Sequence, residues 1–261
     1  MSVEVLTFRL EARGGPAGRQ VLRTDASDRN VRLECEARFE GPLPRAEVVQ
    51  LSRCRPEDGV SYAFQERTRD RNGTRGFRID LDGRAGLIRF TPSDGDPAEA
   101  PAIEEVRDPL SLLRELRRTG PEVQRIRLPM LGKTVEARAV GETDLETDLG
   151  PKRARAFLLH PGGAWVWIDV APPHAVLKLA QRTVEGRVDA LLSSIAQEAS
   201  MPLWEELDDG RKGSSRRRKR RRRGRGGRAR SGKGGRGGER AGGGRGGGRS
   251  GAGGGGGGDD G

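Results

Sequence analysis

An unbroken run of eight basic residues near the C-terminus carries the clearest chemistry in this sequence. The run, RRRKRRRR, spans residues 216–223, and further arginines follow it among glycines. A guanidinium group offers a planar pair of donors to a phosphate and stacks on an exposed base. The pattern therefore predicts binding to RNA or single-stranded DNA. The predicted nucleic-acid-binding residues are Arg216, Arg217, Arg218, Lys219, Arg220, Arg221, Arg222, Arg223, Arg225, Arg228, Arg236 and Arg245.

The positive charge of the chain is confined to this C-terminal region. Residues 211–261 contain 18 of the 49 basic residues and three of the 38 acidic ones, a net charge of +15. The 31 basic and 35 acidic residues that remain leave residues 1–210 with a net charge of −4. This asymmetry indicates a polyanion-binding tail rather than a domain with a basic face.

The tail is too polar and too rich in glycine to fold alone, so we expect residues 210–261 to be disordered. Nothing rigid places a side chain against a base edge, and we expect binding without sequence specificity. Two other interpretations stay open, a solubilising tail and a compositional extension without function. An anionic membrane surface would also attract the run, but no apolar anchor accompanies it.

A second candidate site is a pair of tryptophans in the segment AWVWIDV. Trp165 and Trp167 alternate with Val166 and Ile168, so both faces of this predicted strand carry apolar side chains. Two tryptophans on one face would suit the wall of a pocket for an apolar ligand, or a platform on which bases stack. Ordinary core packing is the simpler interpretation.

The two cysteines do not form a predicted disulfide. A hairpin turn centred near Pro42 and Leu43 places Cys35 opposite residue 50 and Cys54 opposite residue 31. An offset of four residues corresponds to about 13 Å along a strand, whereas a disulfide requires Cα atoms less than about 7 Å apart. Cys35 lies on the apolar face of its segment, which predicts a buried free thiol.

No catalytic, metal or cofactor motif accompanies these candidates. His160 and His174 are fourteen residues apart in turn-like contexts, which is poor spacing for a metal site. The serines lack a nucleophile-elbow context, and the Gly pairs match neither a P-loop nor a dinucleotide fingerprint. We therefore expect a non-enzymatic protein without a cofactor.

The segments before the tail show the period-two alternation of half-buried β-strands. In NVRLECEARFE, apolar residues at 31, 33, 35, 37 and 39 alternate with charged ones. Short strands separated by Gly, Pro and Asp predict an all-β, mainly antiparallel fold, an open barrel or strongly curved sheet. The predicted strands cover residues 3–10, 19–23, 31–39, 45–53, 60–64, 77–81, 87–91, 124–128, 134–140, 155–159, 164–170 and 175–180. Residues 184–195 have apolar residues at helical spacing but also fit a last strand, which Gly186 favours because glycine weakens a helix.

One helix interrupts this pattern, over DPLSLLRELRRTG. Asp108 is a suitable N-cap, Pro109 occupies the first helical position, and Gly120 ends the helix. Its leucines form an apolar stripe, so we expect this helix to pack against the sheet or to plug one end of a barrel. The preceding segment, residues 93–106, is acidic and Pro/Ala-rich and is predicted to be a surface loop.

The order of these segments resembles the bacterial domain of unknown function 3108 family. The resemblance covers roughly residues 3–197 and rests on LTFRLEARGGPAGR, FRIDLDGRAGLIRF, RDPLSLLRELR and HAVLKLAQRTVEGRVDALLSSI, with DPLSLL closest to a motif. It implies an open β-barrel or curved sheet around an apolar interior and no known activity. Many members are exported, whereas this chain has no recognisable signal peptide and carries the basic tail.

Together these observations predict a β-rich domain over residues 1–209 and a cationic tail over residues 210–261. The first predicted function is non-enzymatic association with RNA or single-stranded DNA through the tail. The alternative is a barrel-like carrier or binding module for an apolar ligand, with the tail serving solubility or attachment to anionic surfaces. The N-terminal segment and the absence of any 18-residue apolar run predict a cytoplasmic protein without a membrane span. The oligomeric state stays open.

Overall fold

The computed structural model describes residues 2–27, 29–102 and 105–199, all within a structural unit that runs from Met1 to Gly210. The predicted disordered tail and its nucleic-acid-binding residues lie outside the described residues. The elements are β1 Val3–Ala12, β2 Gly15–Ala26, β3 Val31–Phe39, β4 Ala46–Cys54, β5 Ser61–Asp70, β6 Gly73–Asp82, β7 Leu87–Pro92, β8 Ala98–Pro101, α1 Pro109–Thr119, β9 Arg125–Met130, β10 Lys133–Thr147, β11 Gly150–His160, β12 Ala164–Asp169, β13 Val176–Thr183 and β14 Gly186–Glu198.

All fourteen strands belong to one antiparallel sheet, which confirms the predicted all-β class. Their spatial order is β8-β7-β6-β5-β4-β3-β2-β1-β14-β13-β12-β11-β10-β9. The first strand therefore pairs with the last, Val3 opposite Glu198, and joins the two halves of the chain at the centre of the sheet. The sheet does not close on itself, since β8 and β9 remain as its two edges.

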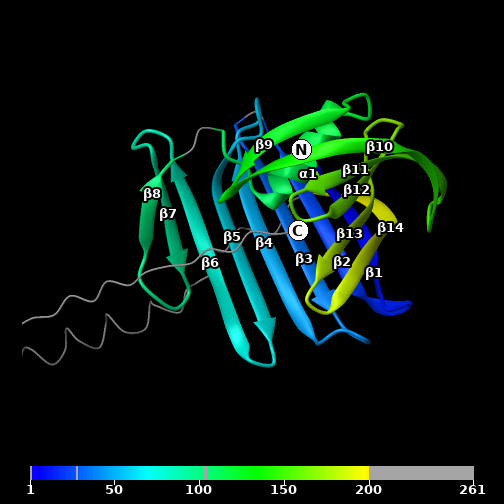
Figure 1. The fold of residues 1–261 in the computed structure, drawn as a ribbon, viewed down its shortest axis with the longest axis horizontal. Helices are drawn as coiled ribbons and strands as arrows, with labels where there is room; N and C mark the ends of the chain where they lie inside the picture. Colours follow the sequence, from blue (N-terminus) through cyan, green and yellow to red (C-terminus); the bar gives the residue numbers. More distant parts are fainter. Residues whose placement is uncertain (1, 28, 103–104, 200–261) are drawn as a thin grey trace, which may run out of the picture. The chain divides into compact units, whose positions relative to one another are not determined.

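The sheet curls around an apolar interior, as the alternation in the sequence predicts. Figure 1 shows β9–β14 lying across from β2–β5, with α1 between these two parts. One buried cluster joins side chains of both parts, for example Leu22 and Leu33 with Phe157 and Val166. Burial of these side chains is the main favourable term in folding, at about 25 cal/mol per Å² of apolar surface.

A short segment between β8 and α1 connects the two parts of the barrel at one end. The N–H of Ser61, at the start of β5, donates to the carbonyl oxygen of Val106 at 3.0 Å. The N–H of Arg107 donates to the carbonyl of Pro129 on β9 at 2.8 Å, and its carbonyl accepts from Leu131. We call residues 106–107 the strap. The strap links β5 to the β9–β10 hairpin near the N-terminus of α1.

The helix begins and ends as its sequence predicts. Asp108 is the N-cap, Pro109 opens the helix, and Gly120 adopts φ 72° at its C-terminal end, a left-handed value that favours glycine. Leu110, Leu112 and Leu116 are buried in the same cluster as the sheet residues. The prediction that this helix packs against the sheet is therefore confirmed.

The side chain of Asp108 fixes this helix to two strands. Its carboxylate accepts from the hydroxyls of Ser52 on β4 and Ser61 on β5, at 2.5 and 2.6 Å. It also accepts from the N–H groups of Leu110 and Ser111, at 2.8 and 3.0 Å. Burial raises the pKa of this carboxyl above its ordinary value, and the four hydrogen bonds only partly oppose that shift.

Two details of the sequence interpretation change in the structure. Residues 98–101, within the predicted surface loop, form the edge strand β8, although all four residues are exposed. The segment predicted as the last strand, residues 184–195, is β14, which begins at Gly186 and reaches Glu198. No helix among the described residues is long and apolar enough to cross a membrane.

Replacing Asp108 should weaken the domain more than an ordinary surface substitution. In Asp108→Ala, two buried hydroxyls and two helix N–H groups lose their acceptor, and we expect a loss of about 2–4 kcal/mol in the free energy of unfolding. Asp108→Asn keeps one acceptor oxygen, so its free energy of unfolding should fall by less. Urea denaturation followed by circular dichroism measures both losses, and Asp96→Ala, at an exposed position, is the control. Equal stability of Asp108→Ala and Asp96→Ala would contradict this role.

Candidate functional site

The inside of the curled sheet contains a cavity of about 520 Å³. Its size lies within the range of small-molecule sites, about 300–1,000 Å³. Side chains from strands on both parts of the barrel line it, together with the first turns of α1. The cavity is therefore a product of the whole fold rather than of one local motif.

Apolar side chains form most of the surface of this cavity. On α1, Leu110, Leu112 and Leu113 form one side of the lining, which we call the floor. Leu22 on β2 and Val166 on β12 contribute to the walls. Leu110 and Leu113 are three residues apart and so lie on the same side of the helix, and Leu112 contributes from beside them.

A few polar side chains interrupt this apolar lining, on β2, β4, β5, β10 and β13. Gln50 and Glu66 face the interior on neighbouring strands and are opposite one another in the register. The amide nitrogen Nε2 of Gln50 donates to Oε2 of Glu66 at 2.8 Å. Gln50 is also opposite Cys35, so a cysteine, an amide and a carboxylate stand in one row across the inner face.

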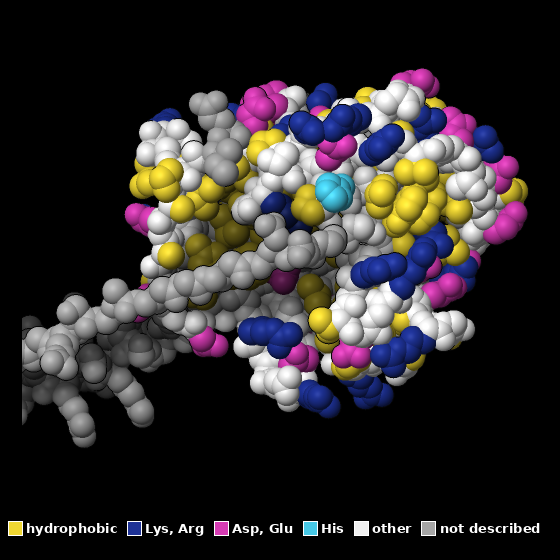
Figure 2. Space-filling view, viewed as in Figure 1, with side chains coloured by type: hydrophobic (Ala, Val, Ile, Leu, Met, Phe, Trp, Pro, Cys, Tyr) yellow, Lys and Arg dark blue, Asp and Glu magenta, His cyan; other side chains and the backbone are white. Residues whose placement is uncertain are grey.

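The apolar inner face continues beyond the cavity onto β6 and β7. Phe64, Phe77 and Phe90, on three successive strands, have ring centroids 6.0 and 5.5 Å apart. Exposure rises outward along this series, from 2% for Phe64 to 38% for Phe90. Figure 2 shows hydrophobic side chains gathered over this part of the sheet. Exposed apolar surface of this kind is typical of binding surfaces.

Only one tryptophan of the predicted pair, Trp165, belongs to the lining of the cavity. Trp165 and Trp167 stack with ring centroids 5.7 Å apart and an interplanar angle of 20°. The residues that alternate with them, Val166 and Ile168, are buried in the core cluster. Trp165 is among the residues that line the cavity, and Trp167 is not. Lys178 instead places its ammonium group 5.2 Å from the centroid of Trp167.

The two cysteines have the register that the hairpin predicts. Cys35 is opposite Gln50 and Cys54 is opposite Val31, and both are buried free thiols. Burial raises the pKa of Cys35 to about 12, with nearby glutamates including Glu66 adding to the shift. Burial likewise raises the pKa of Cys54 to about 12. Neither thiol has the lowered pKa of a nucleophile or redox cysteine.

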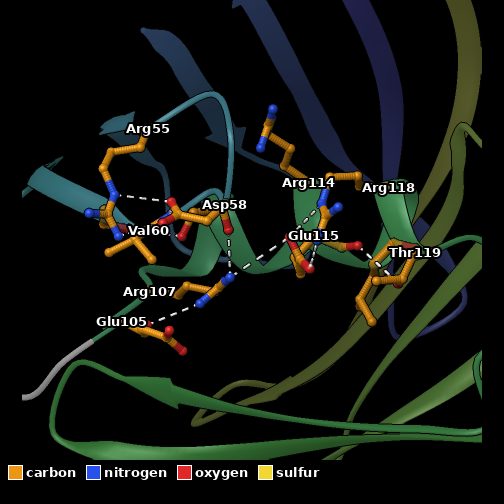
Figure 3. Close-up of polar contacts among 12 residues, drawn as sticks. Arg55, Asp58, Val60, Glu105, Arg107, Arg114, Glu115, Arg118 and Thr119 are labelled. Carbon is orange, nitrogen blue, oxygen red and sulfur yellow. Dashed lines mark hydrogen bonds and ion pairs between the residues drawn. The ribbon is translucent and has the colours of Figure 1, made fainter.

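A group of charged side chains surrounds the strap and the middle of α1 (Figure 3). Arg107, which is buried, donates to the carbonyl oxygens of Asp58 and Glu105 at 2.6 and 3.0 Å. Glu115 of the helix is paired with Arg118 at 2.6 Å and lies 3.9 Å from Arg107. These contacts hold the strap and the loop before β5 against α1, so we interpret the group as structural.

The histidines and acidic residues do not assemble into a metal centre in the described part of the chain. No group of three or more His, Cys, Asp or Glu side chains among residues 2–27, 29–102 and 105–199 has the geometry to hold a metal ion. Nδ1 of His174 forms a hydrogen bond with the carbonyl oxygen of Asp169 at 3.0 Å, within the turn that follows β12. His160 is exposed at the end of β11.

Comparison with known proteins supports the fold and does not assign a family. No family model matches the sequence, and no curated protein matches it. A solved β-barrel-like protein of the domain of unknown function DUF1849 from Brucella abortus is 8% identical, with a TM-score of 0.52. The match covers 76% of this chain and 98% of that protein. At this identity the likeness concerns the fold alone, and the resemblance to the 3108 family stays a prediction.

The two thiols should be inert while the protein is folded. With pKa values of about 12, roughly one thiol in 10⁴ is ionised at pH 8, so little thiolate is available to react. We expect an aromatic disulfide reagent to modify neither cysteine in native protein and both in guanidinium chloride. Absorbance of the released thiolate measures both reactions. Rapid modification of the native protein at pH 8 would contradict the raised pKa values of the two thiols.

Proposed function

We propose that the domain is a non-enzymatic binding protein for a small apolar or amphipathic ligand. The observation that carries this proposal is the cavity of about 520 Å³ between the curled sheet and α1. Protein interiors are otherwise packed about as densely as organic crystals, with few voids larger than a water molecule. Apolar cavities of sufficient size take up apolar molecules.

Two features of the cavity support a ligand rather than a packing defect. Its lining is mostly apolar but includes a small number of polar groups, the usual composition of a ligand site. The sheet is also unclosed between β8 and β9, and the inner apolar face continues onto β6 and β7 beside this opening. The barrel-like fold of the Brucella abortus protein is compatible with such a role.

Filling the cavity should abolish this binding. Ala37 lines the cavity on β3, and Ala37→Phe would occupy part of the volume. We expect the affinity for N-phenylnaphthylamine, a neutral dye that fluoresces in apolar surroundings, to fall roughly tenfold or more. A fluorescence titration of the full-length protein measures this change.

The control for this experiment is Val140→Phe, because Val140 is 58% exposed and adds bulk outside the cavity. It should bind the dye as the unmodified protein does. Native mass spectrometry of the purified protein gives an independent readout, since a retained ligand appears as added mass. Absence of dye binding to the unmodified protein would refute the proposal.

We also propose that the C-terminal tail binds RNA or single-stranded DNA without sequence specificity. The observation that favours this second function is the basic octet at residues 216–223 within a region of net charge +15. Each neutralised phosphate releases counterions, so binding of this kind weakens steeply with salt. Six to eight such contacts correspond to a slope of log K against log salt of roughly −4 to −7.

Replacing all eight residues of the octet with serine tests the tail in the full-length protein. We expect the affinity for a fluorescently labelled oligonucleotide to fall strongly at low salt and the salt slope to become shallower. Fluorescence anisotropy across a salt series measures both quantities. A control with the tail residues shuffled at constant composition should keep its affinity, because no base-specific geometry is involved. If the serine variant binds as tightly as the original, the tail is not the nucleic-acid-binding element.

A further inference from the structure

The cavity wall contains one carboxylate, Glu66, among mostly apolar side chains. Glu66 faces inward on β5, between Gln50 on β4 and Phe77 on β6 in the register. Its hydrogen bond within the described residues comes from the neutral amide of Gln50, at 2.8 Å. The adjoining lining residues Cys35 and Val48 offer no further cationic partner.

Glu66 is the main charged group that faces the cavity, because the lining contains few other charged side chains. Lys133, at the start of β10, is the one cationic residue among those that line the cavity, and it is exposed. Glu66, in contrast, is partly buried and stands in the same row across the inner face as Gln50 and Cys35. A charge in this mostly apolar lining acts more strongly than the same charge in water.

These surroundings favour one kind of polar group over another. A carboxylate accepts hydrogen bonds and offers no donor, so a hydroxyl or a protonated amine satisfies it. A second carboxylate brought into the same apolar wall is disfavoured by like-charge repulsion and by the cost of desolvation. The Gln50 amide already donates to Glu66 and leaves its own carbonyl oxygen as a further acceptor.

We infer that the ligand is an amphiphile with a hydrogen-bond-donating end group, an alcohol or a protonated amine, and that Glu66 determines this specificity. This inference rests on the proposed ligand-binding function. The end group lies at Glu66 and Gln50, and the apolar chain extends toward Leu110, Leu112 and Leu113 of α1. Anionic amphiphiles such as fatty acids are poor ligands for this site.

A matched series of compounds tests the inference in the full-length protein. Dodecylamine, dodecanol and dodecanoate share one chain and differ in the end group. Each is used below its micelle concentration to displace N-phenylnaphthylamine from the protein. We expect the amine to bind most tightly and the carboxylate least. Glu66→Gln should weaken amine binding by about tenfold and strengthen carboxylate binding, because it removes the charge and keeps the shape.

The control is Glu47→Gln, which makes the same charge change on β4. Glu47 lies on the opposite face of the sheet, within 3.6 Å of Arg38, and should leave all three affinities unchanged. Both variants keep the cationic tail, so any attraction of dodecanoate to the tail cancels in the comparison. Thermal melts establish that the variants fold.

The outcomes separate this inference from the proposed function. If none of the three compounds displaces the dye, the ligand-binding function itself fails. If they displace it but dodecanoate binds as tightly as the amine, the inference fails and the function stands. That comparison uses the unmodified protein and holds even if Glu66→Gln does not fold. Loss of dodecanoate binding in Lys133→Met would then assign end-group recognition to Lys133.

Discussion

The carboxylate of Asp108 holds α1 to the inner face of the sheet through hydroxyls on β4 and β5. Its other oxygen caps the helix, so one side chain fixes both the start of the helix and its position. The leucines that form the cavity floor follow within one turn. A carboxylate buried in this way is stable only when several donors satisfy it, which makes the arrangement specific to one helix position. The position of the helix set by Asp108 in turn places Leu110, Leu112 and Leu113 in the cavity lining.

The strap bridges the opening of the curled sheet at one end, and this asymmetry follows from the path of the chain. The strap connects β5 with the β9–β10 hairpin beside the N-terminus of α1. Further along β5, no strand pairing joins it to β9, because β6, β7 and β8 continue the sheet outward instead. The inner apolar face therefore extends past the cavity onto strands that β9–β14 do not cover in Figure 1. Glu66 lies on β5, where the enclosed part of that face gives way to the exposed part.

The sequence predicts those features that depend on local patterns. Alternation identifies the strands, the cap residues identify α1, and the turn near Pro42 sets the register of Cys35 and Cys54. Trp165 was predicted as a wall residue and lines the cavity, but Gln50 was missed because it alternates with the apolar Val49 and Leu51 on β4 and gives no apolar signal for the inner face. The edge strand β8 was missed because its exposed, Pro-bounded sequence has no apolar face. The strand pairing in the structure, β4 with β5 and β7 with β8, reveals both features.

Charge acts over different distances in the two proposed functions. The tail carries a net charge of +15, but at physiological salt its field is screened beyond about 8 Å. The tail can therefore attract polyanions without recognising their base sequence. Glu66 is a single charge at contact distance in an apolar wall, where screening by salt is weak and one group distinguishes donor from acceptor. A diffuse charge is suited to affinity for any phosphate backbone, and a local charge to selection among small ligands. The two kinds of charge are separated along the chain, because residues 1–210 carry a net charge of only −4.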